Sequence, residues 1–245
     1  MTSNPIYIAM WSGPRNISTA MMRSFGGRSD CAVSDEPFYG AFLKTTGQRQ
    51  PMADEVIASM DCNWHSVADS MRGPVPGGQP LWYQKHMPHH MVADVSIGDF
   101  PDHRHAFLIR DPVRVVASYA AKRVEVSAED LGYARQLDYV DQATQMTGKA
   151  PIVLDSADIV RDPEAYLRAL CEALDISWDS GMLHWEAGPR DSDGIWAAHW
   201  YGRVLETTGC GGSESTAPQL DAAAQRIADA CQPWYERLSA YKIRL

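Results

Sequence analysis

The stretch from residue 6 to residue 27 constrains the fold of this chain more than any other. Residues 6–11 form a short apolar run with β-branched side chains, which predicts a buried strand. Residues 12–16 contain the glycine and proline of a tight turn, and residues 17–25 place apolar side chains on one helical face. The helix is expected to stop at the Gly26-Gly27 pair. The stretch therefore predicts a strand, a tight loop and a helix in direct succession.

The loop and the start of this helix predict an anion-binding site. Backbone N–H groups and the positive end of the helix dipole converge there. Ser18 and Thr19 add hydroxyl donors, and Arg15 adds a charged fork that suits phosphate oxygens. The triphosphatase pattern G-x-x-x-x-G-K-[ST] is not met, because its second glycine and its lysine are missing. Triphosphate chemistry with magnesium is therefore disfavoured, and an ordinary turn with a serine cap is the alternative interpretation.

The composition predicts one acidic globular domain over residues 1–245. A chain of 245 residues that is 45% hydrophobic can bury a substantial core, and two full domains would be a tight fit. The 22 Lys and Arg residues against 31 Asp and Glu residues give a net charge of −9, which disfavours nucleic acid and acidic membranes as partners. A local basic cluster must then hold any anionic ligand.

The cysteines and the hydropathy pattern predict a cytoplasmic protein without a metal. The five cysteines are odd in number, widely spread and without a C-x-x-C pair, which favours reduced thiols. His89 and His90 have no carboxylate or cysteine at ligand spacing. The first residues lack the features of a secretory signal, and no apolar run is long enough for a membrane span. The oligomeric state stays open.

The remaining periodic segments predict an α/β fold. Further strand candidates are residues 31–34, 80–86, 106–109 and 151–155. Further helical stretches are residues 52–71, 112–122, 128–147, 163–174 and 218–241. Strands and helices that alternate in this way favour a mainly parallel sheet covered on both faces, a three-layer sandwich.

Polar residues follow two of these strands at the sheet edge where open α/β sheets bind ligands. Glu36 follows the second strand and is a candidate base, with a solvated loop carboxylate as the alternative. Lys85 and His86 end the third strand candidate. A lone histidine in such a place is more often structural than catalytic.

A second anion site is predicted after the strand at residues 106–109. Arg110 stands at the strand tip, and Ser118 lies about two turns into the following helix, so both can address one anion. A pairing of Arg110 with Asp111 that only ties the loop is the alternative. Later in the chain, residues 188–196 form a polar, glycine-punctuated loop suited to close over a ligand.

Three stretches together resemble the sulfotransferases that use 3′-phosphoadenosine 5′-phosphosulfate (PAPS). The family's 5′-phosphosulfate loop is similar to SGPRNISTAMMRS, and its 3′-phosphate motif, Arg-x-Pro-x-x-x-x-x-Ser, is similar to IRDPVRVVASY. The strand and helix that follow in the family are similar to IVLDSADIVRDPEAYLRALCEAL. Because the three occur in the family's order, the resemblance implies the P-loop-like sulfotransferase fold.

The resemblance also implies which residues bind PAPS. For the 5′-phosphosulfate these are Gly13, Arg15, Asn16, Ser18 and Thr19. For the 3′-phosphate they are Arg110 and Ser118, so the guanidinium groups of residues 15 and 110 should lie on the same side of the molecule. The loop that begins at Arg190 resembles the family's late Arg-Lys-Gly loop, although its lysine and glycine are not at the family's positions.

Two residues compete for the role of the catalytic base. The run Gln84-Lys85-His86-Met87-Pro88 resembles the family's Lys-Thr-His-Leu-Pro, whose histidine is the base, so the carry-over falls on His86. The lysine is shifted by one position, which leaves Lys85 to carry charge at the transferring group. In other branches of the family a glutamate after the second strand is the base, and Glu36 occupies that place.

The resemblance therefore implies transfer of a sulfuryl group from PAPS to the hydroxyl of a small-molecule alcohol. Such a reaction needs positioning, positive charge on the leaving phosphate and a base for the acceptor, without a covalent enzyme intermediate. A nucleotide-dependent kinase or phosphotransferase on the same fold and a non-catalytic nucleotide-binding protein are the two alternatives.

Overall fold

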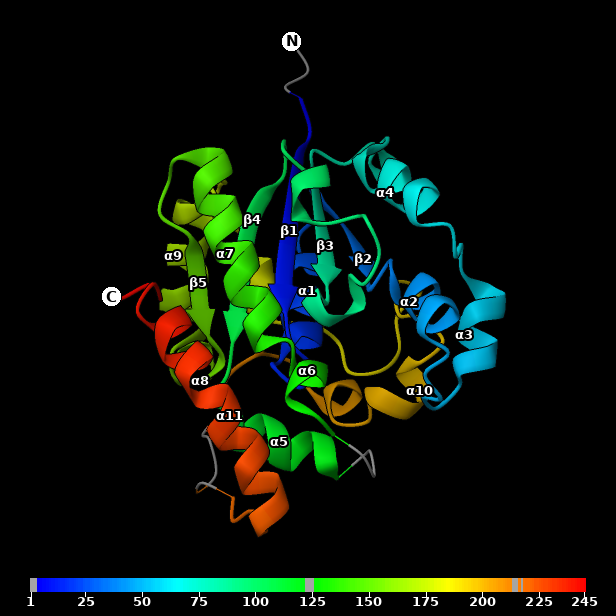
Figure 1. Cartoon of the computed structure of the whole chain (residues 1–245). Helices are drawn as coiled ribbons and strands as arrows, with labels where there is room; N and C mark the ends of the chain where they lie inside the picture. Colours follow the sequence, from blue (N-terminus) through cyan, green and yellow to red (C-terminus); the bar gives the residue numbers. More distant parts are fainter. Residues whose placement is uncertain (1–3, 122–125, 213–215, 217) are drawn as a thin grey trace.

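A five-stranded, fully parallel sheet forms the centre of the structure, a computed structural model that describes residues 4–121, 126–212, 216 and 218–245. The strands lie in the order β2-β3-β1-β4-β5 (Figure 1). Their bounds are β1 (Ile6–Ser12), β2 (Cys31–Asp35), β3 (Leu81–His86), β4 (Arg104–Ile109) and β5 (Ile152–Asp155). The chain order reverses direction across β1, so the carboxyl ends of β1 and β4 flank a topological switch point, where open α/β sheets bind ligands.

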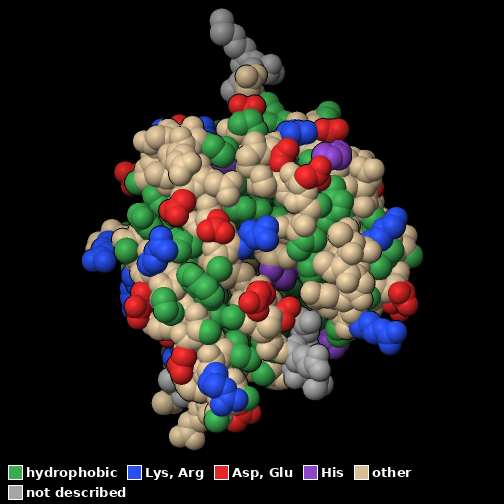
Figure 2. Space-filling view, viewed as in Figure 1, with side chains coloured by type: hydrophobic (Ala, Val, Ile, Leu, Met, Phe, Trp, Pro, Cys, Tyr) green, Lys and Arg blue, Asp and Glu red, His purple; other side chains and the backbone are tan. Residues whose placement is uncertain are grey.

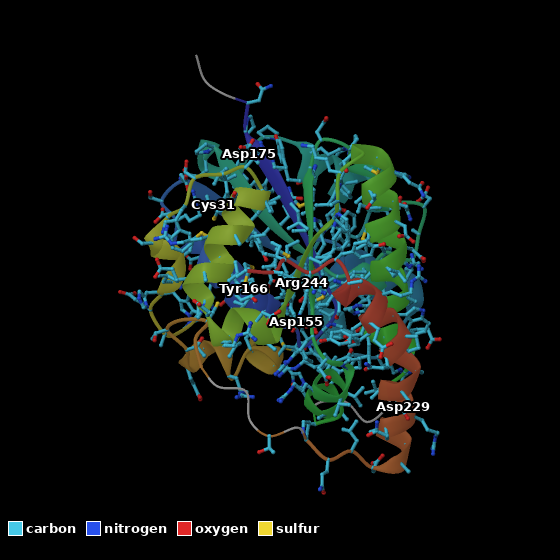
Figure 3. All side chains as sticks on the ribbon, turned by 90° about the vertical axis from the view of Figure 1, so that its left-hand side faces the viewer. Cys31, Asp155, Tyr166, Asp175, Asp229 and Arg244 are labelled. Atoms are coloured by element: carbon cyan, nitrogen blue, oxygen red, sulfur yellow. The ribbon has the colours of Figure 1, made fainter. Side chains whose placement is uncertain are left out.

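Helices cover both faces of the sheet and make the predicted three-layer sandwich. The helices are α1 (Ser18–Gly26), α2 (Tyr39–Thr46), α3 (Ala53–Ser59), α4 (Trp64–Arg72), α5 (Pro112–Ala120), α6 (Ala128–Leu131), α7 (Tyr133–Thr147), α8 (Ser156–Arg161), α9 (Pro163–Ala173), α10 (Ala197–Trp200) and α11 (Ala222–Ser239). Figure 3 shows the layers from the side, with α9, which carries Tyr166, on one face and α11, which carries Asp229, on the other. The predicted α/β fold class is therefore confirmed.

The central strand β1 is buried on both faces. Its side chains alternate between two apolar cores, with Ile8 and Met10 packed beside α1 and α9, and Ala9 and Trp11 packed beside α7 and α11. A period of two residues produces this division, because successive side chains of a strand point to opposite faces. Burial on both faces explains why the strand reads as a continuous apolar run.

The prediction of two long helices is wrong, because each of these stretches forms two shorter helices. The stretch 52–71 forms α3 and α4, with Met60 in an extended conformation between them and the Asn63 side chain capping α4. The stretch 128–147 forms α6 and α7, with Gly132 between them at a φ of 73°. Asparagine at an N-cap and glycine in the left-handed region are both local signals for a helix boundary. The predicted end of another helix at residue 122 lies outside the described residues.

Helix α1 ends at Gly26, as predicted, but glycine is needed there for a different reason. Gly27 has φ −76° and ψ −14°, which any residue adopts. A Cβ atom on Gly27 would lie only 2.3 Å from the carbonyl oxygen of Gly181, whereas a Cβ atom on Gly26 would lie 3.7 Å from the Val33 side chain. Glycine is therefore required at position 27 because the backbones of Gly27 and Gly181 approach closely, and not because the residue has a left-handed conformation.

This difference predicts opposite outcomes for two neighbouring substitutions. Gly27→Ala should lower the free energy of unfolding by about 1–3 kcal/mol, since backbone must move to admit the methyl group. Gly26→Ala, the matched control, should be neutral or stabilising by up to about 1 kcal/mol, because alanine favours the helix. Urea denaturation of both variants measures the difference, and equal stabilities would contradict the packing described here.

Candidate active site

A cavity of about 400 Å³ opens at the carboxyl edge of the sheet. Its walls include the loop after β1, the start of α1, the residues after β2, β3 and β4, and the segment 200–212. Most candidate residues from the sequence lie on these walls, namely Arg15, Asn16, Ser18, Thr19, Glu36, Lys85, Arg110 and Ser118. The switch point of the sheet therefore carries both predicted anion sites.

The loop after β1 presents backbone amides to this cavity. Arg15 and Ile17 both have left-handed backbone conformations, with φ of 62° and 55°. Ile17 is the N-cap residue of α1 and makes no side-chain cap, so the serine cap of the alternative interpretation is wrong. The first backbone hydrogen bond of the helix runs from Met21 N to Ile17 O at 3.0 Å. The amides of residues 18–20 therefore have no acceptor within the helix. Successive N–H groups in such a loop form a concavity that binds anions.

Gly13 and Asn16 fix the shape of this loop. A Cβ atom on Gly13 would lie 2.4 Å from the carbonyl oxygen of Leu131, so only glycine fits there. The Asn16 side chain is buried and donates to the carbonyl oxygen of Leu108 at 3.1 Å. The Ser156 hydroxyl donates to the carbonyl oxygen of Asn16 at 2.9 Å. These contacts tie the loop to β4 and to the start of α8.

The two predicted anion sites are joined through Arg15. Its Nε atom donates to the Ser118 hydroxyl at 2.9 Å, and its Nη1 atom donates to the carbonyl oxygen of Trp200 at 3.2 Å. Arg110 Nη1 donates to the carbonyl oxygen of Arg15 at 3.0 Å. Both arginines line one cavity, so the expectation that they lie on the same side of the molecule is confirmed.

Two further arginines that the sequence reasoning missed line the same cavity, Arg114 and Arg203. Burial, together with the neighbouring charges of Arg110 and Arg203, lowers the pKa of Arg15 from its usual value. Figure 2 shows that basic and acidic side chains are interspersed over one outer face of the molecule, whose net charge is −9. A cavity lined by four arginines in an acidic protein is a site for a strongly anionic ligand.

Lys85 lies at the base of the cavity in a buried ionic cluster. Its Nζ atom lies 2.8 Å from Asp35 Oδ1 and 2.9 Å from the Tyr201 hydroxyl, and it makes a short ion pair with Glu36. Asp35 and Glu36 raise the pKa of Lys85 well above its usual range, although burial acts in the opposite direction. Burial raises the pKa of Glu36, with Asp35 adding to this effect and Lys85 opposing it. The cluster thus holds one cation and two carboxyl groups, of which Lys85 and Glu36 line the cavity.

His86 lies in the apolar core and is not among the residues that line the cavity. Its ring stacks on Trp11 with centroids 4.6 Å apart, and its Nε2 atom lies 3.1 Å from Gln84 Oε1. Burial lowers the pKa of His86 well below its usual range. His89 and His90, which follow it in the chain, line the cavity instead.

Arg190 is exposed and also lies off the cavity lining. Its Nη2 atom donates to the carbonyl oxygen of Glu186 at 3.1 Å. The loop that contains it is fixed by a buried salt bridge of 2.6 Å between Asp193 and Arg23. The residues after this loop, Tyr201 among them, reach the cavity.

Two general properties of the described residues bear on the class of site. Across residues 4–121, 126–212, 216 and 218–245, no three His, Cys, Asp or Glu side chains are grouped so that they would hold a metal ion. Within the same part of the chain, every helix falls short of the length or the hydropathy that a bilayer crossing requires.

The parallel sheet and the amide-lined loop at its switch point define a P-loop-like α/β protein. The family model for the sulfotransferase domain matches residues 6–242. The chain therefore belongs to the sulfotransferase family. The predicted family resemblance is therefore confirmed.

Known proteins support the fold. The sulfotransferase domain of the Synechococcus PCC 7002 olefin synthase superposes with a TM-score of 0.57 at 16% identity, covering 94% of this chain and 95% of that one. A sulfotransferase from Alicyclobacillus acidocaldarius superposes with a TM-score of 0.53 at 12% identity, covering 98% and 96%. At such identities the likeness shows a shared fold.

A plant protein is a nearer relative in sequence. Branched-chain-amino-acid aminotransferase-like protein 2 of Arabidopsis thaliana is 34% identical over 235 residues, which are 96% of this chain and 41% of the relative. The chain thus spans about two fifths of that relative's length. The aminotransferase-like name does not describe this chain, because the sulfotransferase domain accounts for nearly all of it.

Proposed function

We propose that this sulfotransferase-family chain transfers the sulfuryl group of PAPS to a hydroxyl of a small-molecule acceptor. The observation that carries the proposal is the pair of anion sites in one cavity, linked by the 2.9 Å hydrogen bond from Arg15 to Ser118. An adenosine bisphosphate carries two anionic groups at separate ribose positions, and one site would take each. The family match supports sulfuryl transfer as the reaction class.

The donor's 5′-phosphosulfate is assigned to the start of α1. The amides of residues 18–20, the hydroxyls of Ser18 and Thr19, and the Arg15 guanidinium would hold it, while Gly13 and Asn16 keep the loop in shape. Both the sequence of the loop and its backbone conformation support this assignment.

The donor's 3′-phosphate is assigned to Arg110, which lies before α5, and to Ser118 near the end of that helix. Arg110 and Ser118 would hold it, and Arg114 adds a guanidinium on the same helix. Arg203 takes the place first given to Arg190 as the cation from the late segment, because Arg203 lines the cavity. Four guanidinium groups would then balance a ligand that carries several negative charges.

The chemical step needs positive charge on the departing phosphate and a base for the acceptor hydroxyl. PAPS supplies an activated sulfuryl group whose transfer leaves 3′-phosphoadenosine 5′-phosphate. Arg15 and Lys85 stabilise negative charge as it develops on the phosphate oxygen. Glu36 accepts the hydroxyl proton, and it is preferred to His86 because it lines the cavity, whereas His86 lies in the core.

Replacing Arg15 tests the donor site. Arg15→Ala should lower turnover, followed as transfer of radiolabelled sulfate from PAPS, by about 10²-fold, since a lost donor to transition-state charge costs a few kcal/mol. Arg190→Ala is the matched control, because it removes an exposed guanidinium outside the cavity, and it should stay within about twofold of wild type. Turnover of Arg15→Ala within about threefold of wild type would contradict the assignment.

The same preparation separates the alternatives for the ligand. Micromolar 3′-phosphoadenosine 5′-phosphate should raise the melting temperature without magnesium, because a ligand bound only by the folded state stabilises it. Stabilisation and phosphoryl transfer with ATP and magnesium, in the absence of sulfuryl transfer, would favour the kinase interpretation instead.

Replacing Glu36 and His86 in turn identifies the base. Glu36→Gln should lower kcat by about 10²- to 10⁴-fold while affinity for 3′-phosphoadenosine 5′-phosphate stays within a few-fold. His86→Phe keeps an aromatic ring against Trp11 and should retain kcat within a few-fold. Since burial raises the pKa of Glu36, wild-type activity should fall with decreasing pH at a midpoint above the usual glutamate value of about 4.3. Loss of activity in His86→Phe alone, with a stable fold, would reverse the assignment.

A further inference from the structure

The Asp35 carboxylate is fixed by three donors from separate parts of the chain. Lys85 Nζ lies 2.8 Å from Oδ1, the Tyr201 hydroxyl donates to Oδ2 at 2.5 Å, and the Gly194 amide donates to Oδ2 at 3.3 Å. Asp35 is also the register partner of Lys85 between the adjacent strands β2 and β3. The side chain is only 2% exposed. A carboxylate that accepts several hydrogen bonds is stabilised in its charged form.

Glu36 has a different environment although it is the next residue. Its φ of 43° is left-handed, which turns the chain at the end of β2, and the residue lines the cavity. One oxygen, Oε1, contacts Lys85, and the other, Oε2, lies 3.9 Å from His90 Nδ1. Burial lowers the pKa of His90 well below its usual range, so its imidazole faces Glu36 as a neutral group.

The charges of the cluster do not balance. The groups that face Glu36 are Lys85 from β3, Asp35 from β2, His90 from the turn Pro88–His90, and Tyr201 after α10. Lys85 is the one permanent cation among these four groups, and it faces two carboxyl groups in a buried setting. Two neighbouring carboxyl groups in unlike environments separate into one that stays charged and one that exchanges a proton.

We propose that Asp35 and Tyr201 are positioning residues: Asp35 is the fixed counter-charge of Lys85, Tyr201 fixes Asp35, and Glu36 is the residue that exchanges the acceptor proton. This division deepens the proposed sulfuryl transfer and rests on it for its catalytic meaning. The acceptor oxygen forms a bond to sulfur as the bond from sulfur to the 5′-phosphate oxygen breaks. The bisphosphate departs with that electron pair, and the acceptor proton passes to Glu36 and then to solvent.

Tyr201 also connects the late segment of the chain to the ionic cluster. The segment begins at Asp193, whose salt bridge with Arg23 is buried, and continues through Trp196, whose indole N–H donates to the Tyr201 hydroxyl at 3.2 Å. A single tyrosine hydroxyl therefore contacts this segment, Asp35 and Lys85. Removing that hydroxyl should disturb the division of charge while leaving the Asp193 anchor in place.

The direct test is a carboxyl NMR titration of the full chain with isotope-labelled Asp and Glu side chains. Glu36→Gln and Asp35→Asn identify the two signals. In the wild-type protein, the Glu36 signal should move with decreasing pH at a midpoint above the usual glutamate value of about 4.3. A Glu36 midpoint at or below the usual glutamate value would overturn the proposal, and this result needs only the wild-type protein and one foldable variant for assignment.

Variants then test how the division is maintained. Asp35→Asn removes the neighbouring negative charge, so the Glu36 midpoint should fall by about one pH unit. Tyr201→Phe removes one donor to Asp35, so the Glu36 signal should move at a different pH from that in wild type. This variant suffices if Asp35→Asn does not fold. Arg190→Ala is the matched control, because it removes an exposed side chain outside the cavity, in the loop before this segment, and the Glu36 signal should behave as in wild type.

Two outcomes separate this proposal from the proposed function. An unchanged Glu36 midpoint in a folded Asp35→Asn or unchanged signals in Tyr201→Phe would overturn the positioning roles. Calorimetry of 3′-phosphoadenosine 5′-phosphate binding is the independent readout. A protein that gives the expected NMR result but does not bind this nucleotide would keep the proton assignment and lose the proposed donor.

Discussion

The backbone amides at the start of α1 are the feature on which the rest of the site depends. The loop before them contains two non-glycine residues in left-handed conformations, Arg15 and Ile17, and each such residue costs about 1–3 kcal/mol. Asn16 offsets part of this cost through its hydrogen bonds with β4 and with Ser156 at the start of α8, which hold the loop at the switch point of the sheet. The strained backbone gives the loop a fixed shape, as the proposed anion site at the start of α1 requires.

The arginines of the cavity favour an anionic ligand, as the amides at the start of α1 do. Mutual repulsion among Arg15, Arg110 and Arg203 is unfavourable in the free protein. The attraction of each arginine for a ligand with several negative charges would offset this repulsion. The negative net charge of the chain makes this cluster stand out from its surroundings. The part of the cavity around Lys85 and Glu36 has carboxyl groups in excess over lysine and is suited to handle a proton instead of binding a phosphate.

The fold was predictable because its signals are local. The buried run of β1, the turn and the amphipathic α1 stand next to one another in the chain, and the spacing of Arg110 and Ser118 lies within one strand-helix unit. Asp35 and Tyr201 were missed because their importance depends on the pairing of β2 with β3 and on a contact between residues far apart in the chain. His86 illustrates the same limit, since only the packing around Trp11 places its ring in the core.

The most direct measurement is a crystal structure of the chain with 3′-phosphoadenosine 5′-phosphate. The account predicts the 5′-phosphate at the amides of residues 18–20 and the 3′-phosphate between Arg110 and Ser118, within hydrogen-bond distance of both. A nucleotide bound outside this cavity, or bound with its two phosphates exchanged, would contradict it.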